Sequence, residues 1–374
     1  MKRKYPLPLN QFQRLNREEI TYKFFQAFLE ARKGKLNTED EYNFEINWRE
    51  NLERLVEEVL SGRYKPSRGI AFVVHDHVRR EIFAAPFRDR IVHHFIYAEV
   101  ESWWDRRFIN NSFSCRVGKG TLYGIERLEK DIRSVTENYT KRAMVFKFDI
   151  EGYFMSLPRD GLFRRALWGL KQQFPNGGPK YQLLKYLWAE IIFDDPVKGV
   201  RYRPPRSAWK LLPTSKILAL QPEGRGIVIG NLSSQLLSNI YLDQLDRFIT
   251  MQLGYKHYGR YVDDFYIVVP YEKKQQVLAD TKAISAELTR LGLTLHPRKF
   301  FAQEATHGIP FLGMVLYPHH RVMNRRYKNN FYRAAIKYRE GKVGLDTLES
   351  YVGGAKYASS RHLCEKMLAE AGLA

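Results

Sequence analysis

The sequence predicts an α+β fold in which helices flank a few strands that carry acidic residues. Apolar residues recur at helical spacing within residues 1–65 and again over 86–108. Residues 143–149, AMVFKFD, alternate apolar and polar side chains as a half-buried strand does, and they end on Asp149. Residues 259–269, GRYVDDFYIVV, place two adjacent acids inside an apolar, β-branched run. This pattern is typical of a strand hairpin with the acids at its turn.

Length and charge restrict the class of protein. The 374 residues suffice for two or three structural units, and 44% of them are apolar, so the chain is globular. A formal charge of +20 favours nucleic acid as partner over an acidic membrane surface, or over a basic protein with no such partner. No apolar run reaches the length of a membrane span, and MKRKYPLPLNQF lacks the apolar core of a secretory signal. The two cysteines form no disulfide framework, so we expect a cytoplasmic protein with no membrane partner.

Capping and turn signals place the other elements. Asn16 begins a first helix with a capping-box pattern, and Thr38 opens a second helix that continues to Gly62. A Pro- and Gly-rich stretch, residues 171–222, predicts an insertion with short strands. The remaining expected elements are a helix that starts at Pro158, helices over 232–249, 272–291 and 321–342, and strands near 257–262, 265–269 and 309–317.

The acids Asp263 and Asp264, together with Asp149, indicate a metal-dependent site. Three carboxylates that converge on one point repel each other unless cations neutralise them, and hard divalent ions such as Mg²⁺ prefer oxygen ligands. Two such ions about 4 Å apart stabilise the attacking and the leaving oxygens in phosphoryl transfer. An Asp-Asp pair in a turn is common by itself, so the prediction depends on the flanking strands and on Asp149.

These segments resemble, in order, the motifs of reverse transcriptases. YVDD is similar to the catalytic signature of that family, and FKFDIEGYF is similar to the motif that supplies its first metal-binding aspartate. The resemblance continues through the fingers motif, the block that positions template and nucleotide, the nucleotide-pocket motif, the late-palm lysine and the primer grip. These lie at residues 79–96, 110–125, 229–246, 291–300 and 309–317.

The resemblance implies a right-hand polymerase with fingers, an antiparallel palm sheet and a short helical thumb. The N-terminal helices are expected to pack on the fingers and to contact RNA or an accessory protein. We place a helical extension at 1–65, fingers at 66–142, a palm with interrupting finger elements and the 171–222 insertion at 143–316, and the thumb at 317–374.

Within the family, the chain resembles the reverse transcriptases of diversity-generating retroelements. Most other relatives carry Gln-Gly and Ser-Pro in the nucleotide-pocket motif, where this chain has Ile229-Gly230 and Ser234-Gln235. The segments FDDPVKG and HGIPFLG are also similar to that branch. Resemblance to this branch implies that the protein copies a structured template-repeat RNA into cDNA, using a primer and dNTPs, and that it introduces mutations mainly at adenines. It also implies a partner, a small basic, oligomeric accessory variability protein.

The resemblance assigns the metal ligands position by position. Asp149 and Asp263 would bind two Mg²⁺ ions directly, with the backbone carbonyl of Ile150 as a further ligand and Mn²⁺ as an alternative ion. Asp264 would complete the acidic cluster with a looser contact. These residues would form the catalytic centre.

Other residues would bind the nucleotide. Phe154 would exclude a ribose 2′-OH, with a core aromatic as the alternative. Arg80 would reach the triphosphate, with Arg79 as a competing candidate. Lys299 would neutralise or protonate the leaving pyrophosphate, with a solvated lysine as the alternative.

The nucleotide-pocket motif predicts low fidelity. Gly230 would let the backbone approach the nucleotide, and Gln235 would contact base or template. Ile229 can only pack, where a glutamine would brace the base pair with a hydrogen bond worth about 1 kcal/mol. Template and primer contacts are expected at Arg116, Lys119, Gly313, Arg325, Arg326 and Lys328. The last three belong to a basic segment, 321–342, with interleaved aromatic residues, for which a solvated helix face is the alternative.

Three other functions are compatible with parts of the pattern. A retron-like, group II intron-like or phage-defence reverse transcriptase would share the palm motifs. An RNA-binding scaffold would need no intact acids, and an RNA-dependent RNA polymerase would not need Phe154. Intact Asp149, Asp263 and Asp264 favour an enzyme.

Overall fold

The computed structural model describes residues 12, 14–33, 38–74 and 79–373. The chain divides into two compact units that are interleaved in sequence. The first unit consists of residues 1–108, 151–244 and 289–293, and the second consists of residues 109–150, 245–288 and 294–374. Each unit is therefore assembled from chain segments that are distant in sequence.

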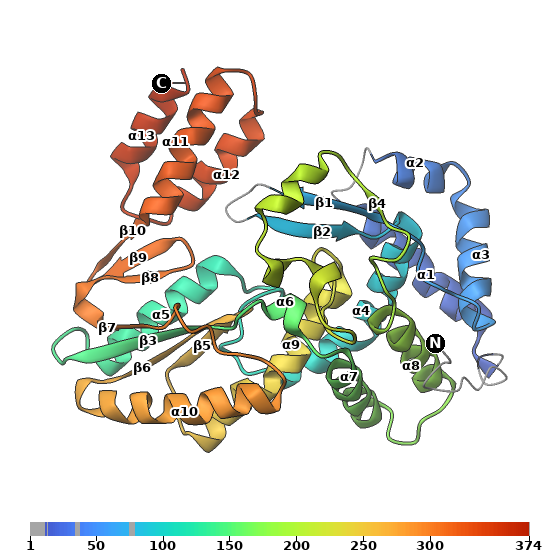
Figure 1. The fold of residues 1–374 in the computed structure, drawn as a ribbon, viewed down its shortest axis with the longest axis horizontal. Helices are drawn as coiled ribbons and strands as arrows, with labels where there is room; N and C mark the ends of the chain where they lie inside the picture. The colour runs from blue at the N-terminus through green and yellow to red at the C-terminus, as the bar shows by residue number, and fades with distance from the viewer. Residues whose placement is uncertain (1–11, 13, 34–37, 75–78, 374) are drawn as a thin grey trace. The chain divides into compact units, whose positions relative to one another are not determined.

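The first unit is mainly helical and carries a small sheet (Figure 1). The sheet has the order β2-β1-β4, with β1 and β2 antiparallel and β4 parallel to β1. Its strands are β1 (Ile70–Val74), β2 (Arg80–Ala84) and β4 (Arg201–Tyr202). Its helices are α1 (Arg17–Arg32), α2 (Glu39–Ile46), α3 (Trp48–Leu60), α4 (Phe87–Arg107), α6 (Tyr153–Ser156), α7 (Arg159–Gln173), α8 (Pro179–Ile192) and the larger part of α9 (Leu232–Arg247).

The N-terminal helices confirm one boundary prediction and correct another. The side chain of Asn16 accepts hydrogen bonds from the backbone N–H groups of Glu18 and Glu19 and so caps α1, as the sequence predicts. The single helix expected from Thr38 to Gly62 is wrong, because the chain leaves helical geometry at Asn47 (φ −123°, ψ 46°). The Asn51 side chain donates to the backbone carbonyl of Phe44 and satisfies a group that the break releases.

The 171–222 segment contains more helix than its composition predicts. Helix α8 starts at Pro179, where a missing N–H costs nothing, and Trp188 is one of its buried apolar residues. The expected short strands are reduced to β4 and are followed by three 3₁₀ turns, Arg206–Leu211, Thr214–Lys216 and Leu218–Leu220. The carboxylate of Glu81, buried on β2, accepts the indole N–H of Trp209 at 2.7 Å and the backbone N–H of Leu218 at 2.8 Å. One buried acid thus holds this segment on the small sheet.

The second unit is built on a four-stranded antiparallel sheet in the order β5-β6-β3-β7. Its strands are β3 (Ala143–Asp149), β5 (Tyr258–Tyr261), β6 (Asp264–Pro270) and β7 (Phe301–Glu304). Helix α5 (Thr121–Val135) packs on this sheet through Ile125, Leu128 and Ile132. The unit also holds a π-helical turn at Phe248–Gln252 and most of α10 (Lys274–Arg290).

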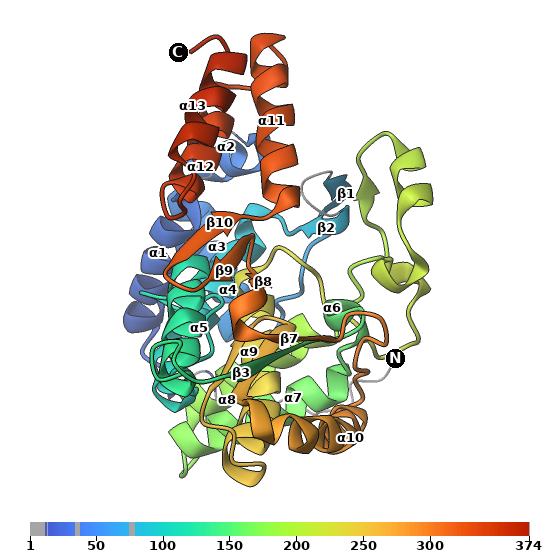
Figure 2. The same ribbon diagram turned by 90° about the vertical axis from the view of Figure 1, so that its left-hand side faces the viewer.

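A second antiparallel sheet and a helical bundle end the chain. The sheet has the order β10-β9-β8, from β8 (Ile309–Phe311), β9 (Met314–Tyr317) and β10 (His320–Met323). Helices α11 (Arg325–Arg339), α12 (Leu345–Ala355) and α13 (Arg361–Glu370) follow as a bundle, drawn in orange to red in Figures 1 and 2. Residues 309–317, expected as strand and similar by resemblance to the primer-grip hairpin, form a hairpin, because Leu312 and Gly313 adopt positive φ and reverse the chain.

The α+β class predicted from the sequence is confirmed, and the second unit contains the expected antiparallel sheet. Within the described residues, no helix combines the length and the apolar character that crossing a membrane requires.

Candidate active site

The three predicted acids lie at adjacent strand ends of the four-stranded sheet. Asp149 ends β3 and pairs across the sheet with Asp264, the first residue of β6. The backbone N–H of Ile150 donates to the carbonyl of Asp263 at 3.2 Å. Two segments far apart in sequence are thereby joined beside the acids. The chain reverses between β5 and β6 at Val262 and Asp263, as the hairpin prediction requires.

The carboxylates perturb one another. Burial, together with the neighbouring carboxylate of Asp149, raises the pKa of Asp263 to about 6. Burial also raises the pKa of Asp264 to about 6, against the opposing charge of Lys147, whose ammonium group lies 3.8 Å from that carboxylate. Lys299 donates to both carboxylate oxygens of Asp149, at 2.8 and 2.9 Å. Two lysines therefore supply positive charge to this acidic group.

The chemistry of these donors fits a hard divalent cation. Carboxylate oxygens and the backbone carbonyl of Ile150 are the ligand type that Mg²⁺ prefers. Burial is the main cause of the raised pKa values of Asp263 and Asp264, and the Asp149 carboxylate adds a repulsion that a cation would relieve. Over residues 12, 14–33, 38–74 and 79–373, no group of three or more His, Cys, Asp or Glu side chains is arranged so that it could hold a metal ion. The metal assignment of Asp149, Ile150, Asp263 and Asp264 stays a prediction.

Most of the predicted nucleotide-binding residues belong to the first unit, whereas Lys299 belongs to the second. Phe154 lies in α6, half-buried, with its ring 5.4 Å from that of Tyr153 in an edge arrangement. Its carbonyl accepts the backbone N–H of Ile227, which ties α6 to the segment that leads into the nucleotide-pocket motif. Arg80, the first residue of β2, and Arg79, which precedes the strand, are both exposed.

The nucleotide-pocket motif follows its predicted turn-to-helix geometry. Ile229 packs against a cluster that includes Phe83 and Met155, so it acts as an apolar contact. Gly230 has φ +118°, a conformation that favours glycine. Gln235 lies in the first turn of α9.

The predicted template and primer residues fall into two groups. Arg116 donates to the carbonyls of Ile109 and Ser112, and Lys119 donates to the carbonyl and side chain of Asn110, so both make hydrogen bonds within their own loop. Gly313 lies in the β8–β9 turn with φ +92°. Arg325, Arg326 and Lys328 occupy the first turn of α11.

The charge at the start of α11 is opposite to the one that a helix favours there. The helix dipole places partial positive charge at its N-terminus, where acids stabilise and bases do not. Its first turn holds no acid. Backbone N–H groups and three basic side chains at one helix end would together suit a phosphate group.

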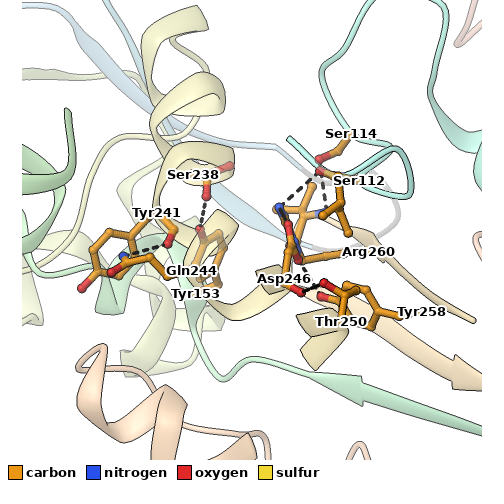
Figure 3. Close-up of polar contacts among 12 residues, drawn as sticks. Ser112, Ser114, Tyr153, Ser238, Tyr241, Gln244, Asp246, Thr250, Tyr258 and Arg260 are labelled. Carbon is orange, nitrogen blue, oxygen red and sulfur yellow. Dashed lines mark hydrogen bonds and ion pairs between the residues drawn. The ribbon is translucent and has the colours of Figure 1, made fainter. Parts of the chain in front are cut away.

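Reasoning from sequence did not find the residues that hold the acidic turn. Arg260 precedes the turn and is fully buried, and it is paired with Asp246, which is also fully buried. Figure 3 shows this pair with Ser112, Ser114 and Tyr258 around it. The sequence does contain an indication of this pair. Arg260 lies in an expected strand and Asp246 in the apolar pattern of the expected 232–249 helix, so two opposite charges occupy positions where core residues are expected.

Comparison with known proteins identifies the family of the chain. A family model described as reverse transcriptase (RNA-dependent DNA polymerase) matches residues 75–316. No curated protein matches the chain.

Two solved structures of apo telomerase from Candida tropicalis are similar to it, each with a TM-score of 0.48. The one truncated from the C-terminal domain is 12% identical, and the alignment covers 69% of this chain and 55% of that one. The other is 10% identical, with 77% of this chain and 56% of that one covered. This chain thus spans little more than half of their length.

The family match covers the segments that contain Asp149, Ile229 and Asp263, and it ends within β9. The predicted fold class, an α+β right-hand polymerase with an antiparallel sheet, is confirmed. The chain belongs to the reverse transcriptase family of RNA-dependent DNA polymerases.

Proposed function

We propose that this protein is an RNA-directed DNA polymerase that copies a structured template-repeat RNA into adenine-mutagenised cDNA, as part of a diversity-generating retroelement. The main support for polymerase activity is the position of the acids. Asp149 pairs across the sheet with Asp264, and the backbone N–H of Ile150 donates to the carbonyl of Asp263. Acids from two distant segments therefore lie at neighbouring strand ends. Three acids in such a position are costly unless their charge serves a function.

The acids would hold two Mg²⁺ ions, which supply stabilisation of the attacking and leaving oxygens in phosphoryl transfer. Asp149 and Asp263 would bind directly, with Ile150 contributing its carbonyl and Asp264 a looser contact. Lys299 would leave Asp149 for the departing pyrophosphate when the ions and nucleotide bind, since more than half of its side chain is exposed. Its positive charge would then stabilise the leaving group.

Residues of the first unit would select the nucleotide substrate. The Phe154 ring would exclude a ribose 2′-OH and so favour dNTPs over ribonucleotides. Arg79 and Arg80, both exposed, would contact the triphosphate. Arg325, Arg326 and Lys328 would bind the backbone of the template–primer duplex, where the unfavourable charge at the start of α11 would be compensated.

The proposal of a diversity-generating function depends on Ile229. An apolar contact replaces a polar brace in the nucleotide pocket, and a hydrogen bond of that kind contributes about 1 kcal/mol, or roughly a fivefold change in discrimination. Without the polar brace, the pocket would accept mismatched bases opposite template adenines. A small basic accessory protein would be required for activity on the natural RNA.

Primer extension on an RNA template with Mg²⁺ and dNTPs tests the polymerase activity. We expect extension by the natural chain and loss of at least a thousandfold in Asp263→Asn, in the range of catalytic-group removal. A chain that binds the primer–template but does not extend it, alone or with an accessory protein, would indicate a scaffold instead.

Sequencing the cDNA tests the subtype. We expect errors concentrated at template adenines, and a fall in those errors in Ile229→Gln. Errors spread evenly over the four bases would favour a retron-like, group II intron-like or phage-defence enzyme. An unchanged adenine error rate in Ile229→Gln would reject the role of this residue.

A further inference from the structure

Arg260 and Asp246 form a doubly bonded ion pair inside the second unit. Arg260 Nε donates to Asp246 Oδ1 at 2.7 Å and Nη2 donates to Oδ2 at 2.8 Å, and both residues are fully buried. Tyr258 Oη donates to the same carboxylate at 2.6 Å (Figure 3). The Asp246 carboxylate is thus held by two residues of β5 and fixes the plane of the guanidinium.

The same guanidinium reaches the acidic turn. Arg260 Nη1 donates to the carbonyl of Val262 at 2.9 Å, and Nη2 lies 3.2 Å from Ser112 Oγ. The other polar backbone group of Val262, its N–H, donates to Ser114 Oγ at 3.1 Å. Both polar groups of the Val262 backbone therefore have fixed partners.

Val262 needs this support because its backbone is strained. Its φ is +56°, in the left-handed region that β-branched residues avoid. Such a conformation is unfavourable and persists only where the surroundings impose it. The hydrogen bond that Arg260 donates to the Val262 carbonyl and the one that Ser114 accepts from the Val262 N–H supply that constraint.

Stability alone does not account for a charged pair at this depth. The desolvation of two buried ions offsets most of their attraction, so apolar residues of similar volume would often stabilise a fold as well. The next residue along the chain is Asp263, whose carbonyl accepts from Ile150 at the end of β3. The main chain is therefore held on both sides of the Asp263 Cα atom.

We propose that Arg260, held by Asp246, is a positioning residue that sets the Val262–Asp263 turn so that the Asp263 carboxylate takes its working position beside Asp149. This inference rests on the proposed polymerase function. Because misplacement of a reacting group by about 1 Å can cost roughly a hundredfold in rate, a positioning residue affects turnover more than substrate binding.

Arg260→Lys tests the proposal. A single ammonium group cannot bind both Asp246 oxygens and the Val262 carbonyl at once. We expect kcat for primer extension to fall about a hundredfold, while KM for dNTP and Kd for primer–template change less than threefold. We also expect faster hydrogen exchange in the peptide 258–266, measured on the protein without nucleic acid.

A matched control separates position from stability. Arg165 and Asp243 form an ion pair at 2.7 Å within the first unit, in which the Asp243 side chain is fully buried and that of Arg165 is 14% exposed. Arg165→Lys therefore makes the same chemical change at a largely buried pair away from the acidic turn. We expect Arg165→Lys to lower Tm by a similar amount and to keep kcat within threefold and exchange over 258–266 unchanged. Equal losses of kcat in the two variants would overturn the proposal, as would a loss in Arg260→Lys that appears only in KM.

A milder variant covers the case in which Arg260→Lys does not fold. Ser114→Ala removes one hydrogen bond to the Val262 N–H and leaves the ion pair in place. We expect kcat to fall three- to tenfold with faster exchange over 258–266, and unchanged values of both would overturn the proposal. A wild-type chain without polymerase activity would contradict the proposed function, and the exchange comparison alone would then decide whether Arg260 holds the turn.

Discussion

The ammonium group of Lys299 lies 2.8 and 2.9 Å from the two carboxylate oxygens of Asp149. The lysine side chain is 56% exposed and that of Asp149 is 17% exposed, so the pair lies near the surface at the end of β3. An exposed pair of this kind contributes about 0–1 kcal/mol to stability. Its position beside the predicted catalytic acid is therefore more informative than its energy.

Replacement of Lys299 should affect turnover and leave stability unchanged. We expect Lys299→Ala to reduce kcat about a hundredfold, because a general acid or a charge on the leaving pyrophosphate contributes at that level. Tm should change by less than about 2 °C, since the pair is exposed. Single-turnover extension and thermal unfolding measure the two quantities. A rate within threefold of the natural chain would identify Lys299 as a solvated lysine.

Phe154 should determine sugar selectivity. Phe154→Val removes the ring that would meet a ribose 2′-OH, so we expect the ratio of kcat/KM for dNTP over ribonucleotide to fall at least tenfold. The measurement is extension with each nucleotide type on the same primer–template.

The neighbouring ring gives a matched control for this substitution. Tyr153 is buried, and its hydroxyl donates to the carbonyl of Ser238 at 2.7 Å (Figure 3). Tyr153→Phe should lower stability by about 1 kcal/mol without altering sugar selectivity. Unchanged selectivity in Phe154→Val would instead make Phe154 a core aromatic.

Glu81 should hold the 206–220 segment on the small sheet. A glutamine in its place offers one acceptor and one donor to two N–H groups, so one N–H group of Trp209 or Leu218 loses its partner. We expect Glu81→Gln to lower the free energy of unfolding by about 1–3 kcal/mol. We also expect faster tryptic cleavage after Lys210 or Lys216.

The exposed Glu223 of the same unit provides the comparison, since Glu223→Gln should change neither quantity. If the two variants unfold and cleave alike, the buried acid does not anchor the segment.

His93 should make stability depend on pH. Burial lowers the pKa of this imidazole to about 3, and its Nδ1 lies 2.7 Å from Ser233 Oγ. In the unfolded chain the pKa is about 6.5, so acid protonates the unfolded state first. The stabilisation is complete well above pH 6.5 and falls as pH decreases, by about 2 kcal/mol between pH 7 and pH 5.

Urea unfolding at pH 7 and at pH 5 checks this expectation. We expect His93→Gln, which keeps a neutral polar group, to lose about 2 kcal/mol less than the natural chain over the same interval. The same loss in both proteins would show that another group carries the pH dependence.

The local pattern of the sequence determined the elements that form the site. Alternation predicts β3 and the hairpin, and the positions of Asp149, Asp263 and Asp264 at strand ends follow from those runs alone. The resemblance of short motifs to one family, found in the same order along the chain, agrees with the family match over 75–316. These features can be predicted from the sequence because each depends on residues within a few positions of one another.

Only the tertiary structure decided the contacts between distant segments. The Pro- and Gly-rich composition of residues 171–222 did not predict α8. This helix is stabilised by the burial of its apolar residues in the first unit. Nothing in the local pattern shows that Arg260 pairs with Asp246 or that Lys299 binds Asp149. Such pairs depend on the packing of whole elements, because a buried charge selects whichever opposite charge the fold brings within hydrogen-bond distance.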